Sequence, residues 1–144
     1  MISLHACDIA TDLALGTAIR AKAKYIACVP CCHKELLDQY TMPGLEPLTK
    51  FGVFKARFND VLTDSMRALK LEAEGYKVSV VEYISPLDTP KNLLIRATRT
   101  SKVNHRAKAE YDAVRRTLGT TSELDRRCAE LDNEFFVTDE DLMG

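Results

Sequence analysis

The chain has 144 residues and a net charge of −1, with 46% hydrophobic and 28% charged residues. This length suits one domain with a core of ordinary size, and the composition is that of a globular protein. No apolar run approaches the ~20 residues of a membrane-spanning helix, and the first residues lack the features of a signal peptide. Five cysteines, two of them adjacent, make a poor disulfide framework and favour a reducing, cytoplasmic location.

The first third of the sequence predicts alternating strands and helices. The order is strand, helix, strand, helix over residues 1–7, 9–22, 25–29 and 32–40. Asp8 or Thr11 is expected to cap the first helix, and Asp12 to act there in the same way. The side of this helix that faces the sheet is predicted to carry Leu13, Ala14, Thr17 and Ala18. Residues 41–47 form a loop, because two prolines and a glycine cannot continue a helix.

The second part of the chain begins with a strong helical period over residues 53–74. One face is predicted to be apolar, with Phe54, Phe58, Val61, Leu62, Met66, Leu69 and Ala73. The polar positions are expected elsewhere on the helix, at Asp60, Asp64, Arg67, Lys70 and Glu74. Gly75 is placed to end the helix in a left-handed conformation.

Two strands follow, over residues 78–84 and 92–100. The turn between them is too short for a parallel crossover, so we expect the two strands to pair antiparallel. Two helices complete the chain, the first over about 103–118 and the second beginning after a cap at Thr121 or Ser122. The sequence thus predicts an α/β fold whose sheet has about four strands, the last of them antiparallel.

Three short motifs occur in a fixed order along this part of the chain. They are Leu-His-Ala-Cys-Asp at residues 4–8, continuing to Asp12, then Pro-Cys-Cys at 30–32 and Thr-Pro-Lys-Asn at 89–92. Together with Leu62-Thr63-Asp64, they resemble the second half of a family of class I S-adenosylmethionine-dependent methyltransferases. The resemblance implies a partial Rossmann-like methyltransferase sheet within residues 1–100. Residues 101–134 would then be a helical extension, and 135–144 an acidic tail.

The resemblance lacks the first half of the family's domain, which holds the cofactor. The six glycines are too far apart for a Gly-x-Gly-x-x-Gly loop. We therefore expect this chain alone to bind S-adenosylmethionine weakly or not at all, and to have little activity. The open edge of the first strand would be covered by the missing half or by a second copy in a homodimer.

Polar side chains follow the first two predicted strands, at the edge where open α/β sheets bind ligands. The resemblance implies catalytic roles for His5, Cys7 and Cys31, and cofactor contacts for Asp8, Pro30 and Cys32. Lys91 and Asn92, in the third motif, would contact the substrate. Asp8 could equally serve only as a helix cap.

The cysteines leave three interpretations of this edge open. At a helix start, the dipole would lower the thiol pKa of Cys31 and Cys32, and a thiolate could attack a pyrimidine as in RNA cytosine-5 methyltransferases. Alternatively, a zinc or redox site could form from His5, Cys7, Cys31 or Cys32, and His33. We adopt the third interpretation, a small turn that shapes the cofactor pocket, and assign no metal. Cys28 and Cys128 are expected to be inert core residues.

The charge is unevenly distributed along the chain. Residues 91–116 contain eight basic and two acidic residues, whereas residues 130–144 contain six acidic residues and no Lys or Arg. The basic segment is either a solvated face balanced by an acidic tail or a surface for a phosphate-rich partner. The methyl acceptor would then be RNA, or a ribosome-associated protein.

Overall fold

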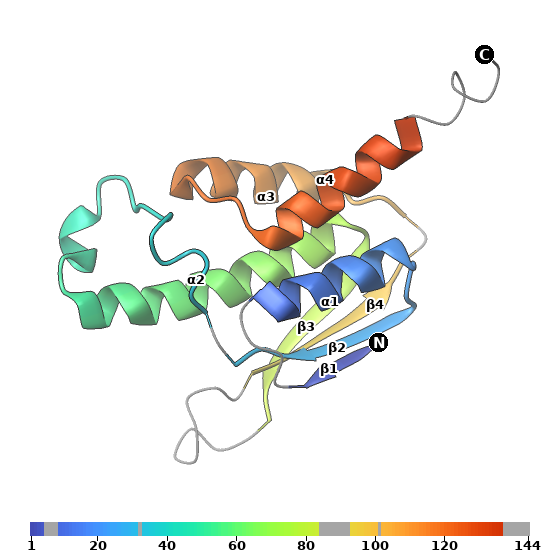
Figure 1. The fold of residues 1–144 in the computed structure, drawn as a ribbon, viewed down its shortest axis with the longest axis horizontal. Coiled ribbons are helices and arrows are strands. Elements are labelled where there is room, and N and C mark those ends of the chain that lie inside the picture. The colour runs from blue at the N-terminus through green and yellow to red at the C-terminus, as the bar shows by residue number, and fades with distance from the viewer. Residues whose placement is uncertain (5–8, 32, 84–92, 101, 137–144) are drawn as a thin grey trace.

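The computed structural model describes residues 1–4, 9–31, 33–83, 93–100 and 102–136, apart from the side chains at positions 3, 4 and 131–136. The described strands are β1 (Ile2–Leu4), β2 (Tyr25–Val29), β3 (Tyr76–Glu82) and β4 (Leu93–Arg99). They form a sheet in the order β1-β2-β4-β3 (Figure 1). The prediction of an α/β fold with about four strands is confirmed.

The last strand is the one that reverses direction. β1 and β2 are parallel, with Leu4 opposite Val29. β4 is antiparallel to β2 on one side and to β3 on the other. β3 therefore runs in the same direction as β2, and the reversed strand lies between them. The predicted antiparallel pairing of the last two strands is confirmed.

The described helices lie over one face of the sheet. They are α1 (Ile9–Arg20), α2 (Gly52–Ala73), α3 (His105–Leu118) and α4 (Glu123–Phe136), with a short 3-10 helix, η1 (Glu46–Thr49). Figure 1 shows α1 and α2 next to the sheet, with α3 and α4 over them; α3 packs on α2, and α4 on α1. None of these helices is long and apolar enough to cross a membrane, as far as the chain is described.

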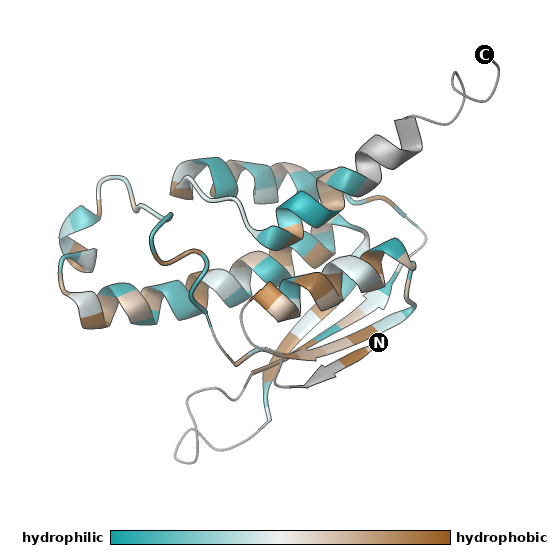
Figure 2. Cartoon of the chain, viewed as in Figure 1, coloured by the Kyte–Doolittle hydropathy of each residue, from teal (hydrophilic) through white to brown (hydrophobic). Residues whose placement is uncertain are grey.

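The main core lies between the sheet and the helices. It contains Leu15, Ile19, Ile26, Cys28, Leu71, Ile95, Leu124 and Cys128, among others. Figure 2 shows this arrangement, because apolar colour follows the strands and α1 while α3 and α4 are mainly hydrophilic. Leu124 and Cys128 belong to α4, so the C-terminal helix shares its core with the sheet. Burial of Cys28 and Cys128 was predicted from the sequence and is confirmed.

Local sequence signals set several helix ends. Gly75 has φ +90°, as predicted, and donates its N–H to Glu72 O at 3.1 Å. Asn104 caps α3 by accepting from the Ala107 N–H at 3.0 Å. Ser122 and Asp125 form a reciprocal capping box at the start of α4, which confirms Ser122 as the cap.

The prediction of the apolar face of α2 is partly wrong. Phe54, Phe58 and Val61 are 53%, 36% and 64% exposed, because the first half of α2 extends beyond the sheet (Figure 1). The buried side chains of the helix include polar residues outside the predicted apolar face, namely Asn59, Thr63, Asp64 and Arg67. Asn59 and Asp64 bind His33 in the loop after β2. Arg67 binds Asp12 of α1.

Two smaller predictions are also wrong. In the described part of residues 32–40 there are only turns and no helix, because the segment is tied to α2 through its side chains and backbone. In α1, Thr17 is exposed, whereas Leu15 and Ile19 are buried with Ala18. Thr11 lies inside α1 and is buried, so it is not the cap of that helix.

Candidate functional site

The candidate site is the edge of the sheet at which β1 and β2 end. Because the two strands are parallel neighbours, the segments that follow Leu4 and Val29 leave the sheet at the same edge. Pro30 is buried there and Cys31 is half-buried. The other predicted site residues lie outside the described residues, and their roles stay predictions: His5, Cys7, Asp8, Cys32, Lys91 and Asn92.

His33 anchors the loop that leaves β2. Its ring is buried, with Nε2 at 2.8 Å from Asp64 Oδ1 and Nδ1 at 3.5 Å from Asp60 Oδ1. Its backbone oxygen accepts a hydrogen bond of 2.7 Å from Asn59 Nδ2. Both ring nitrogens thus face carboxylates of α2 rather than the sheet edge. Within the described residues, no group of three or more His, Cys, Asp or Glu side chains could hold a metal ion.

Arg67 continues this network toward α1. Its Nε donates to Asp12 Oδ1 at 2.8 Å and its Nη1 donates to Asp64 Oδ1 at 3.2 Å. The side chains of Arg67 and Asp12 are only 4% and 3% exposed. A buried guanidinium needs such partners, because burial removes its hydrogen bonds to water. Asp64 therefore joins His33 and Arg67, and the loop after β2 is connected to both helices.

Asp12 lies in the first turn of its own helix, as predicted, and its carboxylate also binds other elements. Besides Arg67, its Oδ2 accepts from the backbone N–H of Leu124 at 3.4 Å. Leu124 lies in the first turn of α4, where backbone N–H groups lack partners within the helix. Asp12 therefore stabilises the start of α4 rather than only that of α1.

Glu35 adds a second carboxyl group beside Asp12. Burial, followed by the neighbouring Asp12 carboxylate and a hydrogen bond to it, raises the pKa of Glu35 to about 7. Arg126 of α4 lies 2.9 Å from Glu35 Oε1 and favours the ionised form. The loop after β2 is thus connected to α4 through a carboxyl group that titrates near neutrality.

The cysteines of this region differ in environment. Cys28 is fully buried, and burial raises the pKa of its thiol to about 11. Cys31 is half-buried, but no helix begins at it in the described residues. The predicted lowering of the Cys31 pKa by a helix dipole therefore has no structural basis. Its assignment as a catalytic residue stays a prediction.

Sequence reasoning missed most of the buried network: Glu35, Asn59, Asp64 and Arg67. One signal could have found part of it. Asn59, Thr63 and Arg67 are spaced by four residues and so share one face of a helix. A polar stripe on a helix that covers a sheet indicates a buried polar network when other polar residues can reach it.

Comparisons with known proteins support a partial likeness to a methyltransferase. Residues 1–39 match a family model described as a methyltransferase domain. The chain is also 28% identical to proteins named Glutathione S-transferase C-terminal domain-containing protein from Homo sapiens and Mus musculus, and 28% identical to the homolog from Drosophila melanogaster. These alignments cover 65% of this chain, but only 19% of the human and mouse proteins and 21% of the fly protein. No solved structure matches the chain.

The family match raises the question of whether the described residues fit S-adenosylmethionine. Carboxylates close to the end of β2 are already engaged, since Asp60 and Asp64 face His33 and Asp12 binds Arg67. No glycine-rich loop is present in the sequence. The described residues therefore do not fit the cofactor by themselves, and no reaction step is assigned to them.

Proposed function

We propose that this chain is the C-terminal portion of a class I S-adenosylmethionine-dependent methyltransferase domain. The observation that carries the proposal is the reversed strand β4 between the co-directional strands β2 and β3. The sequence resemblance implies this ending for a Rossmann-like methyltransferase sheet. The family match over residues 1–39 adds support, because it spans β1, α1 and β2 and includes two of the three motifs.

Under this proposal, the buried network is the support of the site. Hydrogen bonds to the ring and backbone of His33 hold the loop after β2 on α2. This loop begins with Pro30 and Cys31, which the resemblance places against the cofactor and the methyl group. His33, Asp64 and Arg67 would then be positioning residues, because they act through the loop rather than on the substrate.

The proposal requires the cofactor to be held mainly by a glycine-rich half outside residues 1–144. In the described sheet, β1 pairs only with β2 and is therefore an edge strand. Exposed strand edges are normally covered or paired, and Ile2 on this strand is 74% exposed. The glycine-rich half would pair with β1 and bring its loop beside the segments that follow β1 and β2.

The test begins with the genomic sequence immediately upstream of Met1. We expect an in-frame glycine-rich strand-loop-helix segment there. A polypeptide that joins this segment to residues 1–144 should bind S-adenosylhomocysteine with a micromolar Kd in calorimetry, whereas residues 1–144 alone should bind at least ~100-fold more weakly. Absence of such a segment, or micromolar binding by residues 1–144 alone, would contradict the proposal.

A second candidate is a non-enzymatic half-domain that pairs with itself through β1. The same exposed edge favours it. Light scattering distinguishes the two candidates, since self-pairing predicts a stable dimer that Ile2→Pro dissociates by removing a backbone donor. A monomer that binds the glycine-rich half would exclude self-pairing. Elemental analysis of the same sample tests the zinc alternative.

A further inference from the structure

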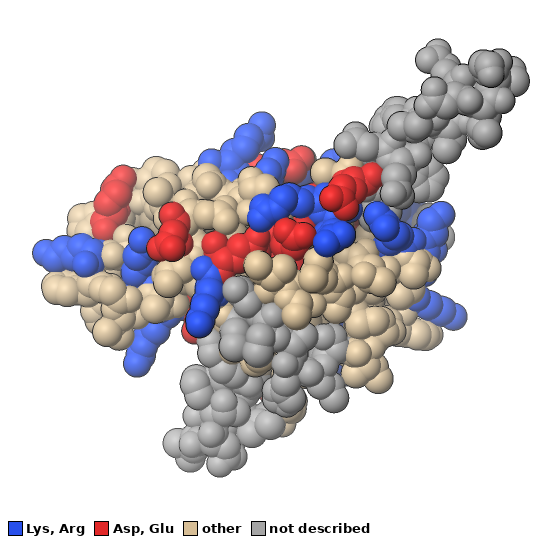
Figure 3. All heavy atoms as spheres, in the orientation of Figure 1, with Lys and Arg blue, Asp and Glu red and all other residues tan. Residues whose placement is uncertain are grey.

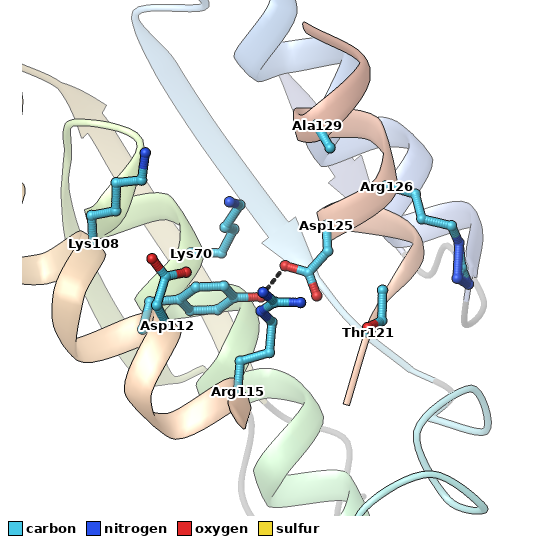
Figure 4. A pocket seen from close by; sticks show the side chains of 9 residues that line it. Lys70, Lys108, Asp112, Arg115, Thr121, Asp125, Arg126 and Ala129 are labelled. Carbon is cyan, nitrogen blue, oxygen red and sulfur yellow. Dashed lines mark hydrogen bonds between the residues drawn. The ribbon is translucent and has the colours of Figure 1, made fainter. Parts of the chain in front are cut away.

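Two cavities lie beside α3. One of about 260 Å³ is bounded by α2, α3 and α4 (Figure 4). The other, of about 220 Å³, lies among the end of α2, the end of β4 and the start of α3. Lys70 and Lys108 line both cavities, so the two hollows meet at this pair of lysines. We call them together the α3 groove.

The α3 groove is rich in basic side chains. Its lining contains Lys70, Arg99, Lys102, Lys108, Arg115 and Arg126, against the acidic residues Glu74, Asp112 and Asp125. Two of the acidic groups contact residues in or beside the groove. Glu74 lies 3.1 Å from Lys70 Nζ, and Asp125 accepts from the hydroxyl group of Tyr111 and from Ser122.

Most of the basic groups are not neutralised. Arg126 points away from the cavity in Figure 4 and pairs with Glu35, and Lys70 pairs with Glu74. The other four form no ion pair with any residue that the structure describes: Arg99, Lys102, Lys108 and Arg115. Lys and Arg side chains also project along the edge formed by α3 in Figure 3. The groove therefore has a net positive charge.

These four cations are arranged in a row rather than around one point. Arg115 lines only the first cavity, Lys108 lines both, and Arg99 and Lys102 line only the second. Lys108 and Arg115 are two helical turns apart, about 10 Å along α3. A single phosphate group is too small to bridge that distance, so the row fits a ligand with several phosphates along its length.

The first cavity of the groove is close to the segment after β2, since Thr121 donates its N–H to Gln39 and Arg126 binds Glu35. The second cavity lies at the opposite edge of the sheet from the candidate site. Gly75 and Arg99 in its lining adjoin the start of β3 and the end of β4. Because β4 is reversed, this is the amino edge of β1, β2 and β3. A ligand along the α3 groove would therefore extend from the amino edge of the sheet toward the segment after β2. An inference about it stands independently of the proposed methyltransferase function.

We propose that the α3 groove binds a nucleic-acid strand through its phosphodiester backbone. A row of unpaired cations matches the regular negative charge of such a strand. The aromatic side chain in the groove, Tyr111, is 2% exposed and its hydroxyl binds Asp125, so it offers no stacking surface for a base. Contacts to the backbone alone predict binding with little sequence preference and strong salt dependence.

The composition of the groove favours a nucleic acid over a membrane. Val103, 69% exposed, is the large aliphatic side chain among the described residues that line it. Surface-bound proteins normally insert several apolar side chains into a bilayer. A concave surface with a row of cations suits a strand better than a flat lipid surface.

The test uses residues 1–144 and a fluorescein-labelled single-stranded oligouridylate in fluorescence anisotropy over a series of salt concentrations. The groove variants are Lys108→Gln with Arg115→Gln, and Arg99→Gln with Lys102→Gln. The control is Lys50→Gln with Arg57→Gln, which removes two exposed charges at the remote end of α2 (Figure 1). Circular dichroism checks that all variants are folded.

We expect salt-dependent binding by the wild type and at least ~10-fold weaker binding by each groove variant at low salt. The slope of log K against log salt should fall in magnitude by about 1.4 in each, since a single-stranded phosphate contact contributes about 0.7. The control should bind within about twofold of the wild type.

Four outcomes would overturn the proposal. They are no binding at low salt, equal loss in the control and groove variants, displacement of the oligonucleotide by an equimolar nucleoside triphosphate, and binding to anionic phosphatidylserine vesicles without binding to the oligonucleotide. The third would assign the groove to a small polyphosphate, and the fourth to a membrane surface.

Discussion

Arg67 and Asp12, 55 residues apart in sequence, form an almost fully buried ion pair between α2 and α1 with an Nε–Oδ1 distance of 2.8 Å. Burial acts to lower the pKa of Arg67, but the Asp12 and Asp64 carboxylates outweigh it and the pKa is raised. A buried cation is tolerated only when its hydrogen bonds are replaced. This pair thus fixes the orientation of two helices that cover the sheet.

Replacing Arg67 with methionine should be strongly destabilising. The change keeps a side chain of similar length but leaves the buried carboxylates of Asp12 and Asp64 unpaired. Removing one partner of a buried ion pair costs about 3–5 kcal/mol, and we expect a loss in this range. Urea denaturation followed by circular dichroism measures it.

Arg57→Met is the matched control, because Arg57 lies on the same helix and is exposed. It should change stability by no more than about 0.5 kcal/mol. The double variant Asp12→Asn with Arg67→Met should lose less than the sum of the two single variants, since the carboxylate is no longer charged. Equal effects of Arg57→Met and Arg67→Met would contradict the importance of the pair.

His33→Ala should destabilise the protein by about 1–3 kcal/mol, because it leaves the buried Asp64 carboxylate without one of its partners. His105→Ala, at an exposed position, serves as the control and should be close to neutral. Thermal denaturation of both variants at neutral pH checks the prediction. If His33→Ala were as stable as His105→Ala, the loop after β2 would not depend on this ring.

Glu35 should make stability depend on pH. Its pKa is about 7 in the folded protein, above the ordinary value of 4.5 that applies when the chain is unfolded. Between these values the folded state binds more protons than the unfolded state. The contribution of Glu35 to the free energy of unfolding is therefore fully present below pH 4.5, and it is lost as the pH rises through about 7.

The variant Glu35→Gln should lack this loss. Its free energy of unfolding should therefore rise relative to that of the wild type as the pH increases. Urea denaturation at several pH values between 4.5 and 7 measures it. Glu46→Gln, at an exposed carboxyl in η1, should follow the wild type throughout. Parallel pH profiles for wild type and Glu35→Gln would show that Glu35 has an ordinary pKa.

Much of the fold was predictable because the signals are local. Hydrophobic runs and helical periods gave the strands and most helices, and the short turn before β4 gave the antiparallel pairing. Gly75 and Ser122 worked as end signals because each acts on the nearest turn of a helix. The reversed direction of β4 relative to β3 followed from connection length alone.

The errors arise where distant parts of the chain meet. Phe54, Phe58 and Val61 fit the apolar stripe of α2 but are exposed. Their exposure was not predictable, because the sequence of α2 does not indicate how far the helix extends beyond the sheet. Arg67 was predicted only to lie off the apolar face, and its burial could not be foreseen because its partner Asp12 is 55 residues away. The helix predicted after Cys31 does not form, because hydrogen bonds between the loop and α2 hold this segment in turns. Local propensity does not contain such tertiary constraints.

The two described cysteines near the end of β2 should differ sharply in reactivity. Burial raises the pKa of Cys28 from the ordinary 9.0 to about 11. This lowers its thiolate fraction about 100-fold relative to a free cysteine, and its sulfur is also shielded from solvent. Cys31 is half-buried and should react first. Iodoacetamide labelling followed by tandem mass spectrometry, which separates the two sites within one peptide, measures both rates.

In the folded protein, Cys28 should remain unmodified while Cys31 is labelled. In concentrated urea the two labelling rates should become similar, because both cysteines are exposed when the chain is unfolded. The destabilised variant Arg67→Met should expose Cys28 faster, since transient unfolding becomes more frequent. His105→Ala should leave the rate unchanged. Rapid modification of Cys28 in the native wild type would contradict its placement in the core, and with it the register that pairs Cys28 with Ile95 in the centre of the sheet.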